Sequence, residues 1–336
     1  MSWTDVFPVL SDEQVADYEL KVLPQEAALL EELCGVARTY NPQTGKHLVS
    51  TCLFWKYCAN NQGEMPKVTR KLMKTAAKKG LISRYAPWDH YVVPLLEGAT
   101  LLNKERPEVV FPVYLAADLK FLVPDLVAVG CEVKLMKSSS IRHNPGAMWR
   151  FLAFEEKDRW VTVTDSDLAR DIVSSVERTE TIMAAGLGLW RVPYIFTSID
   201  ADHHLGHYRP ITASQIGAVG GVLAMDKLMK AFLWHTLRGT MPNECLMRTA
   251  KGKTKPLAIF GTDWPTYGFD EWFLIAVVYP RLAFEGVLTF FSINTKVVTH
   301  WFALDIEYVT WANAKSEILF YDESHLIAPK KGERKK

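Results

Sequence analysis

Short apolar runs in the first half of the chain alternate with longer amphipathic stretches. Runs of roughly four to eight residues that are rich in β-branched and aromatic side chains predict buried strands. Such runs occupy residues 47–54, 109–115, 131–136 and 160–164. Each is followed by a stretch in which apolar side chains recur every three or four positions, which predicts a helix. The hydrophobic pattern therefore predicts strands and helices in alternation.

The helices predicted between and after these strands cover residues 67–79, 88–102, 119–129, 145–154 and 167–185. Strands that alternate with helices at this spacing form βαβ units, which build a largely parallel sheet. We therefore expect an α/β protein with a mostly parallel sheet flanked by helices. Two further helices are expected before the first strand, because Ser11 and Gln14 have capping-box spacing and Pro24 suits a first helical position.

The second half of the chain has a less regular pattern. Its apolar runs predict helices at 226–237 and 269–279, and strands at 256–260, 287–292 and 297–302. No linker rich in glycine, serine or proline separates the two halves. We therefore expect one domain over residues 1–329, with a first half at about 40–167, a second half at 168–329, and a basic tail at 330–336.

The composition is that of an ordinary globular protein. The 336 residues are 49% hydrophobic and 23% charged, with a formal net charge of +1. The five cysteines have no C-x-x-C spacing, so neither a disulfide framework nor a zinc site is expected. The chain shows no signal-peptide pattern and no apolar run near the roughly 20 residues that a membrane span needs. We expect a soluble, cytoplasmic protein.

The strand predicted at 160–164 ends in Asp165-Ser166-Asp167, which places two carboxylates at a strand end. Carboxylate oxygens suit Mg²⁺ or Mn²⁺, and such ions commonly keep waters and bridge to phosphates. Aspartate is also favoured at a helix start, so one of the two side chains could instead cap the following helix. Parallel sheets bind ligands beyond the carboxyl ends of their strands, which favours the metal site.

Three further acids stand at starts of predicted helices. Asp118 follows another predicted strand and is either a second acid on the same rim or a helix cap. Asp270 and Glu271 begin an apolar helix among bulky aromatic residues. Apolar walls around a carboxylate raise its pKa and suit it to general-base catalysis, although the helix dipole alone also favours acids there.

Histidines and glycines in the second half supply the remaining candidates. The loop at 200–210 holds His203, His204 and His207 with two aspartates, but Gly206 and Pro210 argue against the helix that would aim them at one zinc ion. The paired glycines Gly220 and Gly221 resemble a loop that approaches a ligand closely. His300, on a predicted strand, is either a metal ligand or a buried core histidine.

These motifs, in this order, resemble those of nucleotide-sugar glycosyltransferases of the GT-A type. That family combines a Rossmann-type nucleotide-binding half with an Asp-x-Asp at a strand end, a glycine-containing loop, an acidic pair at a helix start and a late histidine. The segment Trp149-Arg150-Phe151 before the Asp-x-Asp, and the pattern Tyr-Gly-x-Asp-x-x-Phe-Leu at 267–274, are also similar to small bacterial and viral (phage-like) transferases. The chain departs from them at Thr164, where arginine is frequent, and at Glu271, where glutamine is frequent.

The resemblance implies a metal-dependent glycosyltransferase that moves a sugar from a nucleotide-sugar donor, expected to be a UDP-sugar, to an acceptor hydroxyl. It also implies a GT-A-like fold with 40–167 as the nucleotide-binding half and 168–329 as the acceptor half. The implied roles are Mn²⁺ or Mg²⁺ binding by Asp165, Asp167 and His300, donor binding by Asp118, Arg150, Gly220 and Gly221, and acceptor-side catalysis by Asp270 and Glu271. A surface ion pair is the alternative role for Arg150. Inversion and retention at the anomeric carbon both stay open.

The acceptor is open between a glycan or small sugar and a hydroxymethylated base in viral DNA, in which case the location is the host cytoplasm. The stretch at 67–84 has seven basic and no acidic residues, and with the tail at 330–336 it could contact a phosphate backbone, although charge runs are usually solvated. One alternative function is a sugar-phosphate nucleotidyltransferase, whose usual Gly-rich, Arg-bearing N-terminal loop is missing. The other is a non-enzymatic nucleic-acid-binding protein.

Overall fold

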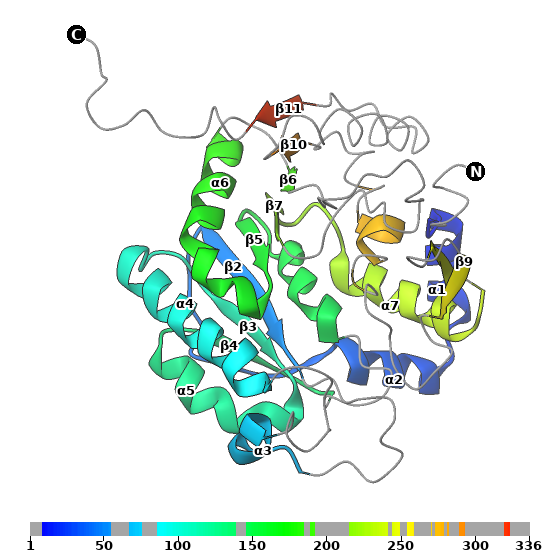
Figure 1. The fold of residues 1–336 in the computed structure, drawn as a ribbon. Coiled ribbons are helices and arrows are strands. Elements are labelled where there is room, and N and C mark those ends of the chain that lie inside the picture. The colour runs from blue at the N-terminus through cyan, green and yellow to red at the C-terminus, as the bar shows by residue number, and fades with distance from the viewer. Residues whose placement is uncertain are drawn as a thin grey trace.

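The structure is a computed structural model, shown in Figure 1. It describes residues 9–54, 67–75, 86–138, 146–184, 189–191, 215–240, 244–248, 254–258, 270, 273–278, 281, 289–292 and 319–322. The predicted positions Glu271 and His300, the histidine loop at 200–210, the strand at 297–302 and the tail at 330–336 lie outside these residues.

A seven-stranded sheet organises the described part of the chain, in the order β1-β4-β3-β2-β5-β7-β6. The strands are β1 (Val36–Tyr40), β2 (His47–Leu53), β3 (Pro112–Leu115), β4 (Glu132–Met136), β5 (Trp160–Thr164), β6 (Leu189–Arg191) and β7 (Gln215–Val219). The central strands β4, β3, β2 and β5 pair in parallel. On the two flanks, β1 pairs with β4, β7 with β5, and β6 with β7, all antiparallel.

The prediction of a mostly parallel sheet is therefore wrong, because the sheet is mixed. The three antiparallel strands lack the long apolar runs by which the central strands were predicted. Strand β1, with the sequence VARTY, is mainly exposed, and β6 has only three residues. Strand β7, with the sequence QIGAV, forms part of the segment interpreted as a glycine loop. What holds is the α/β class, with a parallel centre and antiparallel flanks.

The four central strands have the topology of half a doubly wound fold. Starting from β2, the chain adds β3 and then β4 on one side and afterwards returns to add β5 on the other. Between β2 and β5 the direction of addition reverses, and in open α/β sheets this switch point is where ligands bind, beyond the carboxyl ends of the strands. The sheet thus places a crevice position directly at the end of β5.

Helices cover both faces of the sheet (Figure 1). The α-helices are α1 (Asp12–Lys21), α2 (Pro24–Cys34), α3 (Arg70–Thr75), α4 (Val93–Glu105), α5 (Val123–Ala128), α6 (Ile172–Ala184) and α7 (Met225–Leu237). The 3-10 helices are η4 (Ala117–Leu122), η5 (Gly146–Glu155) and η6 (Ser166–Asp171), and the π-helices are η3 (Trp88–Val92) and η8 (Leu274–Val278). Figure 1 shows α4, α5 and α6 along one side of the sheet and α7 with α1 and α2 on the other.

Two small strand pairs complete the described elements. Strands β8 (Glu244–Arg248) and β9 (Thr254–Ala258) are antiparallel, and β10 (Thr289–Ser292) and β11 (Leu319–Asp322) are parallel. Among the described residues, no helix is both long enough and apolar enough to cross a bilayer.

Local signals at the first two helices act as predicted. The Ser11 hydroxyl accepts from the backbone N–H of Gln14, and the Gln14 side chain accepts from the N–H of Ser11, which is the reciprocal capping box. Pro24 is the first residue of α2, where its missing N–H costs no helical hydrogen bond. Both helices pack against α7 and thereby join the N-terminus to the second half of the chain.

The large aromatic side chains of the core hold η5 between the sheet and the second half. Trp149 and Phe151 of η5 are fully buried, as is Phe273 beside η8. The Phe151 and Phe273 rings lie 6.2 Å apart, and Phe273 lies 5.3 Å from Phe232 of α7. Full burial of each such ring contributes about 2–3 kcal/mol to folding. This cluster fixes the segment that starts at Asp270 over η5.

Candidate functional site

Hydrogen bonds tie the carboxyl ends of the central strands into one rim. The N–H of Ala116, which follows β3, donates to the carbonyl of Leu53 at the end of β2, at 3.0 Å. The N–H of Ala117 donates to the carbonyl of Ser138, beyond β4, also at 3.0 Å. Asp165 follows β5 directly, so it lies on this rim at the switch point between β2 and β5.

The backbone of η5 is anchored on both sides, and this positions Arg150. The Ser50 hydroxyl of β2 donates to the Arg150 carbonyl at 2.7 Å, and the Trp149 indole donates to the Leu33 carbonyl at 2.8 Å. Gly146 allows the close approach of η5 to the end of β2, since an added Cβ would lie 2.6 Å from Cγ of Phe54. Arg150 is therefore held at the strand ends with 6% of its side chain exposed.

The Arg150 guanidinium forks between two carboxylates. One terminal nitrogen (Nη1) donates to Oδ1 of Asp165 at 2.5 Å, and the other (Nη2) donates to Oδ2 of Asp270 at 2.6 Å. The Asp270 side chain is 15% exposed and that of Asp165 is 31% exposed. Three residues predicted to belong to one site, from three distant segments, thus meet in one ion-pair cluster. The alternative considered for Arg150, a surface ion pair, does not describe these contacts, because the Arg150 side chain is buried.

Of the aromatic side chains expected around Asp270, the structure describes that of Phe273, which packs into the core. The Asp270 carboxylate pairs with the Arg150 guanidinium. Asp270 is therefore an ion-paired carboxylate.

Asp167 lies beside a histidine that the sequence pattern did not indicate. It belongs to η6, whereas the side chain of His90 comes from η3, and Nε2 of His90 lies 3.5 Å from Oδ2 of Asp167. Each side chain is about one-third exposed, at 33% and 34%. His90 falls within a predicted helix without any motif around it, so only the fold brings it to the rim.

Cys52 is the second rim residue that the sequence did not indicate. Its sulfur lies 3.9 Å from Nη1 of Arg150 and is fully buried near the end of β2. Burial raises the pKa of the Cys52 thiol to about 11, with Arg150 acting weakly in the other direction. The thiol is therefore protonated at neutral pH and does not serve as a nucleophile. It packs against the guanidinium.

Gly220 and Gly221 do not lie near Asp165. Strand β7 runs antiparallel to β5, so its end at Val219 pairs with Trp160, at the opposite end of β5 from Asp165. Five strand residues separate the two ends by about 16 Å. A Cβ on Gly220 would lie 2.2 Å from the Glu156 carbonyl oxygen, and Gly221 has φ +82°. The two glycines allow β7 to pack closely against the loop before β5.

Asp118 has the position that the pattern predicted. It is half-buried in η4, directly beyond the carboxyl end of β3. It is therefore on the same rim as Asp165, with β2 between their strands.

Within the described part of the chain, no group of three or more His, Cys, Asp or Glu side chains is arranged to hold a metal ion. Asp165 and Asp167 are two carboxylates on one turn, and the third predicted ligand, His300, is outside that part of the chain. Both aspartates have a neighbouring side chain that orients them, Arg150 for Asp165 and His90 for Asp167. Carboxylate oxygens are ligands of the type that a hard divalent cation prefers, and metal-ligating carboxylates commonly carry an outer hydrogen bond like that from Arg150 to Asp165.

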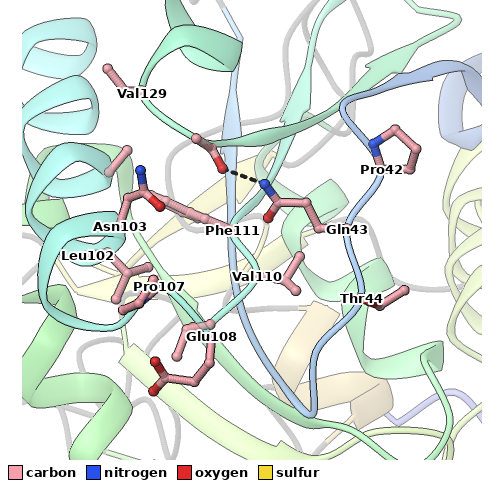
Figure 2. Close-up of a pocket in the computed structure, with 13 residues that line it drawn as sticks. Pro42, Gln43, Thr44, Leu102, Asn103, Pro107, Glu108, Val110, Phe111 and Val129 are labelled. Carbon is pink, nitrogen blue, oxygen red and sulfur yellow. Dashed lines mark hydrogen bonds between the residues drawn. The ribbon is translucent and has the colours of Figure 1, made fainter.

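A pocket of about 320 Å³ lies at the other end of the sheet (Figure 2). Its walls come from the segments just before β2, β3 and β4 and from the end of α4, including Gln43, Asn103, Phe111 and Gly130. The side-chain amide of Gln43, labelled in Figure 2, donates to the Gly130 carbonyl at 2.8 Å. The pocket is thus at the amino ends of the central strands, away from Asp165. The rim at the carboxyl ends combines the charged groups, and we take it as the candidate site.

The comparisons with known proteins add no family to this geometry. No protein-family model matches the chain, and no curated protein matches it. The motifs and the geometry of the rim therefore carry the functional argument.

Proposed function

We propose that the chain is a metal-dependent glycosyltransferase that moves a sugar from a nucleotide-sugar donor to an acceptor hydroxyl. One observation carries the proposal: at the switch point of the sheet, Arg150 joins Asp165 of the Asp-x-Asp motif to Asp270 of the acidic helix start. A donor-side motif and an acceptor-side motif must lie within reach of one reacting sugar, and these two are one guanidinium apart.

The charge at the rim supports binding of a divalent cation. Asp165, Asp167 and Asp270 bring three carboxylates to this rim, and carboxylate oxygens are ligands that Mg²⁺ and Mn²⁺ prefer. In the proposal Asp165 and Asp167 hold Mn²⁺ or Mg²⁺, with His300 as a third ligand. When bound, such an ion acts as a Lewis acid that stabilises negative charge on the leaving diphosphate.

Arg150 has two tasks in the proposed reaction. Its ion pair with Asp165 fixes the orientation of that carboxylate, because rotation would break a hydrogen bond in a largely buried site. Its planar guanidinium also suits contact with phosphate oxygens. If donor binding shifts Arg150 away from one of its carboxylates, the guanidinium can bind the diphosphate of the donor. Both tasks depend on the anchoring of η5 to β2 and α2.

Asp270 is the described carboxylate on the acceptor side. In the transfer, the bond from the anomeric carbon to the diphosphate oxygen breaks, the acceptor oxygen bonds to that carbon, and the hydroxyl proton passes to a base. An ionised Asp270 can accept that proton in an inverting reaction or stabilise a cationic sugar in a retaining one. Glu271, its neighbour in the sequence, is the second candidate for either role.

Binding of the donor tests the proposal most directly. Thermal unfolding would be followed with UDP, GDP, CDP, ADP and dTDP, each with and without Mn²⁺. We expect one nucleoside diphosphate to raise the melting temperature only when Mn²⁺ is present, and the matching nucleotide sugar to be hydrolysed slowly. A protein that responds to no nucleotide in the presence of Mn²⁺ or Mg²⁺ would contradict the proposal.

A further inference from the structure

A cluster of exposed cations lies on and just before α3. The basic patch consists of Lys67, Arg70, Lys71 and Lys74, and all four side chains are exposed. The segment 67–75 contains no acidic residue, and the acid that pairs with it is Asp125 of α5, which contacts Arg70. Lys67, Lys71 and Lys74 add further positive charge to this surface.

Trp88 fixes part of the basic patch in place. The guanidinium carbon of Arg70 and the Lys74 ammonium each lie 4.8 Å from the centre of its ring. Contacts of this kind are worth about 0.5–1 kcal/mol at exposed sites, and they reduce the freedom of long side chains. The charge of the patch is thus partly preorganised.

The same element connects the basic patch to the candidate site. Trp88 is the first residue of η3, and two positions later His90 approaches Asp167 at 3.5 Å. Two residues span at most about 7 Å of chain. The basic patch and Asp167 of the rim therefore contact the same short helix, η3.

The apolar side chains of this segment argue against a membrane as the partner. Helices that lie on a bilayer insert an apolar face between the lipids. Here Val68, Leu72 and Met73 are buried at 6%, 9% and 1% exposure, so they pack into the protein. Within the described segment 67–75 the outward side chains are cationic or polar, which suits a phosphodiester backbone, where affinity comes mainly from neutralised phosphates.

We propose that the basic patch binds the phosphate backbone of a nucleic acid and that the acceptor hydroxyl is carried by that nucleic acid. The inference rests on the proposed function, whose acceptor it names. A hydroxyl on a base would reach the rim only if the base leaves the stack, which is easiest in single-stranded substrate.

The test compares two double variants with the same change of charge. Lys67→Ala/Lys71→Ala removes two exposed lysines of the basic patch, whereas Lys104→Ala/Lys157→Ala removes two exposed lysines near the amino ends of the strands. The probe is a fluorescently labelled single-stranded DNA of 20 nucleotides, titrated between 50 and 200 mM NaCl. With three contacts to a single strand, the wild-type affinity should fall about 20-fold over this range.

We expect the patch variant to bind this DNA about tenfold more weakly at 50 mM NaCl and with a shallower salt dependence, and the control variant to match the wild type. Three outcomes would overturn the inference: equal loss in both variants, no binding by the wild type, or patch-dependent binding to anionic phosphatidylserine vesicles in place of DNA.

The nucleotide response separates the two proposals. If Mn²⁺-dependent stabilisation by a nucleoside diphosphate persists while DNA binding fails, only the acceptor is wrong. Patch-dependent DNA binding without any nucleotide response contradicts the glycosyltransferase instead.

Discussion

Arg150 and Asp270 are 120 positions apart in the chain, and their side chains form an ion pair of 2.6 Å. The same guanidinium binds Asp165, so a single side chain joins the end of β5 to the segment that precedes η8. Breaking a buried ion pair from one side leaves a desolvated charge without compensation, which costs more than the intact pair contributes. This asymmetry makes the cluster testable by substitution.

Replacing Arg150 with Met should lower the free energy of unfolding by about 3 kcal/mol, because two carboxylates would lose their shared partner. This value is at the low end of the cost of removing one partner from a buried ion pair, since the Asp165 side chain is 31% exposed. Urea denaturation would measure the loss. The triple variant Arg150→Met/Asp165→Asn/Asp270→Asn removes the charges together and should recover most of it. A triple variant no more stable than Arg150→Met would show that the lost packing of the arginine dominates.

Replacing Asp167 with Asn should abolish the Mn²⁺-dependent stabilisation by the nucleoside diphosphate and leave the fold intact. The side chain is 34% exposed, so the expected change in unfolding free energy is within about 0.5 kcal/mol. Asp171→Asn, at the exposed end of the same 3-10 helix, is the matched control and should behave as the wild type. An Asp167→Asn protein with unchanged nucleotide response at saturating Mn²⁺ would remove Asp167 from the metal site.

His47 should make the protein less stable in mild acid. Burial lowers the pKa of His47 to about 4, from an ordinary value of 6.5, and outweighs the opposing hydrogen bond with Glu180. In the neutral ring Nε2 bonds the Thr162 hydroxyl at 2.8 Å, and Nδ1–H donates to the Glu180 carboxylate at 3.4 Å. In the unfolded chain His47 becomes protonated as the pH falls below 6.5, whereas in the folded chain it stays neutral until about pH 4. The free energy of unfolding therefore decreases as the pH falls from 6.5 to 4.

The expected loss from His47 alone is about 3 kcal/mol between pH 6.5 and 4. Chemical denaturation at a series of pH values, for the wild type and for His47→Asn, isolates this contribution from that of the other histidines. The variant should be less stable at pH 7 and show a smaller slope below pH 6.5. Parallel curves for the two proteins would mean that His47 titrates normally.

Replacing Gly220 with Ala should destabilise the fold without weakening nucleotide binding by the folded protein. The added Cβ would meet the Glu156 carbonyl at 2.2 Å, and relief of a backbone clash costs about 3 kcal/mol. Gly239→Ala is the control, because that glycine has φ +67° but nothing within 4 Å, so it should cost only about 1 kcal/mol. A Gly220→Ala protein with normal stability but weaker nucleotide binding would restore the interpretation of this turn as part of the donor site.

Periodicity was sufficient to predict the centre of the fold. Strands β2 to β5 are buried on both faces of the sheet, so each is a nearly continuous apolar run in the sequence. Such runs predict strands. The flanking strand β7 was not predicted, because Gly220 and Gly221 follow it directly and glycines favour loops. Its place in the sheet comes from pairing with β5, a contact between residues more than 50 positions apart that no local pattern encodes.

The same division applies to the candidate site. The sequence indicated four aspartates as site residues, because acids at strand ends and helix starts form recognisable patterns. These are Asp118, Asp165, Asp167 and Asp270. The buried ion pairs of Arg150 with Asp165 and Asp270 were not indicated, since burial of its guanidinium depends on how η5 sits between β2 and α7. His90 has no sequence signal either, because its approach to Asp167 arises only from the packing of η3 on η6.

The shared guanidinium of Arg150 also has a thermodynamic consequence for substrate binding. A donor that changes the contact between Arg150 and Asp165 alters the strength of the contact between Arg150 and Asp270, and thus the affinity of any acceptor bound beside Asp270. Such coupling is reciprocal, so the acceptor must change donor affinity by the same factor. Measured in both orders, the two factors should be equal in the wild type and fall toward one in Arg150→Met. Cooperative binding of the two proposed substrates would then follow from one arginine.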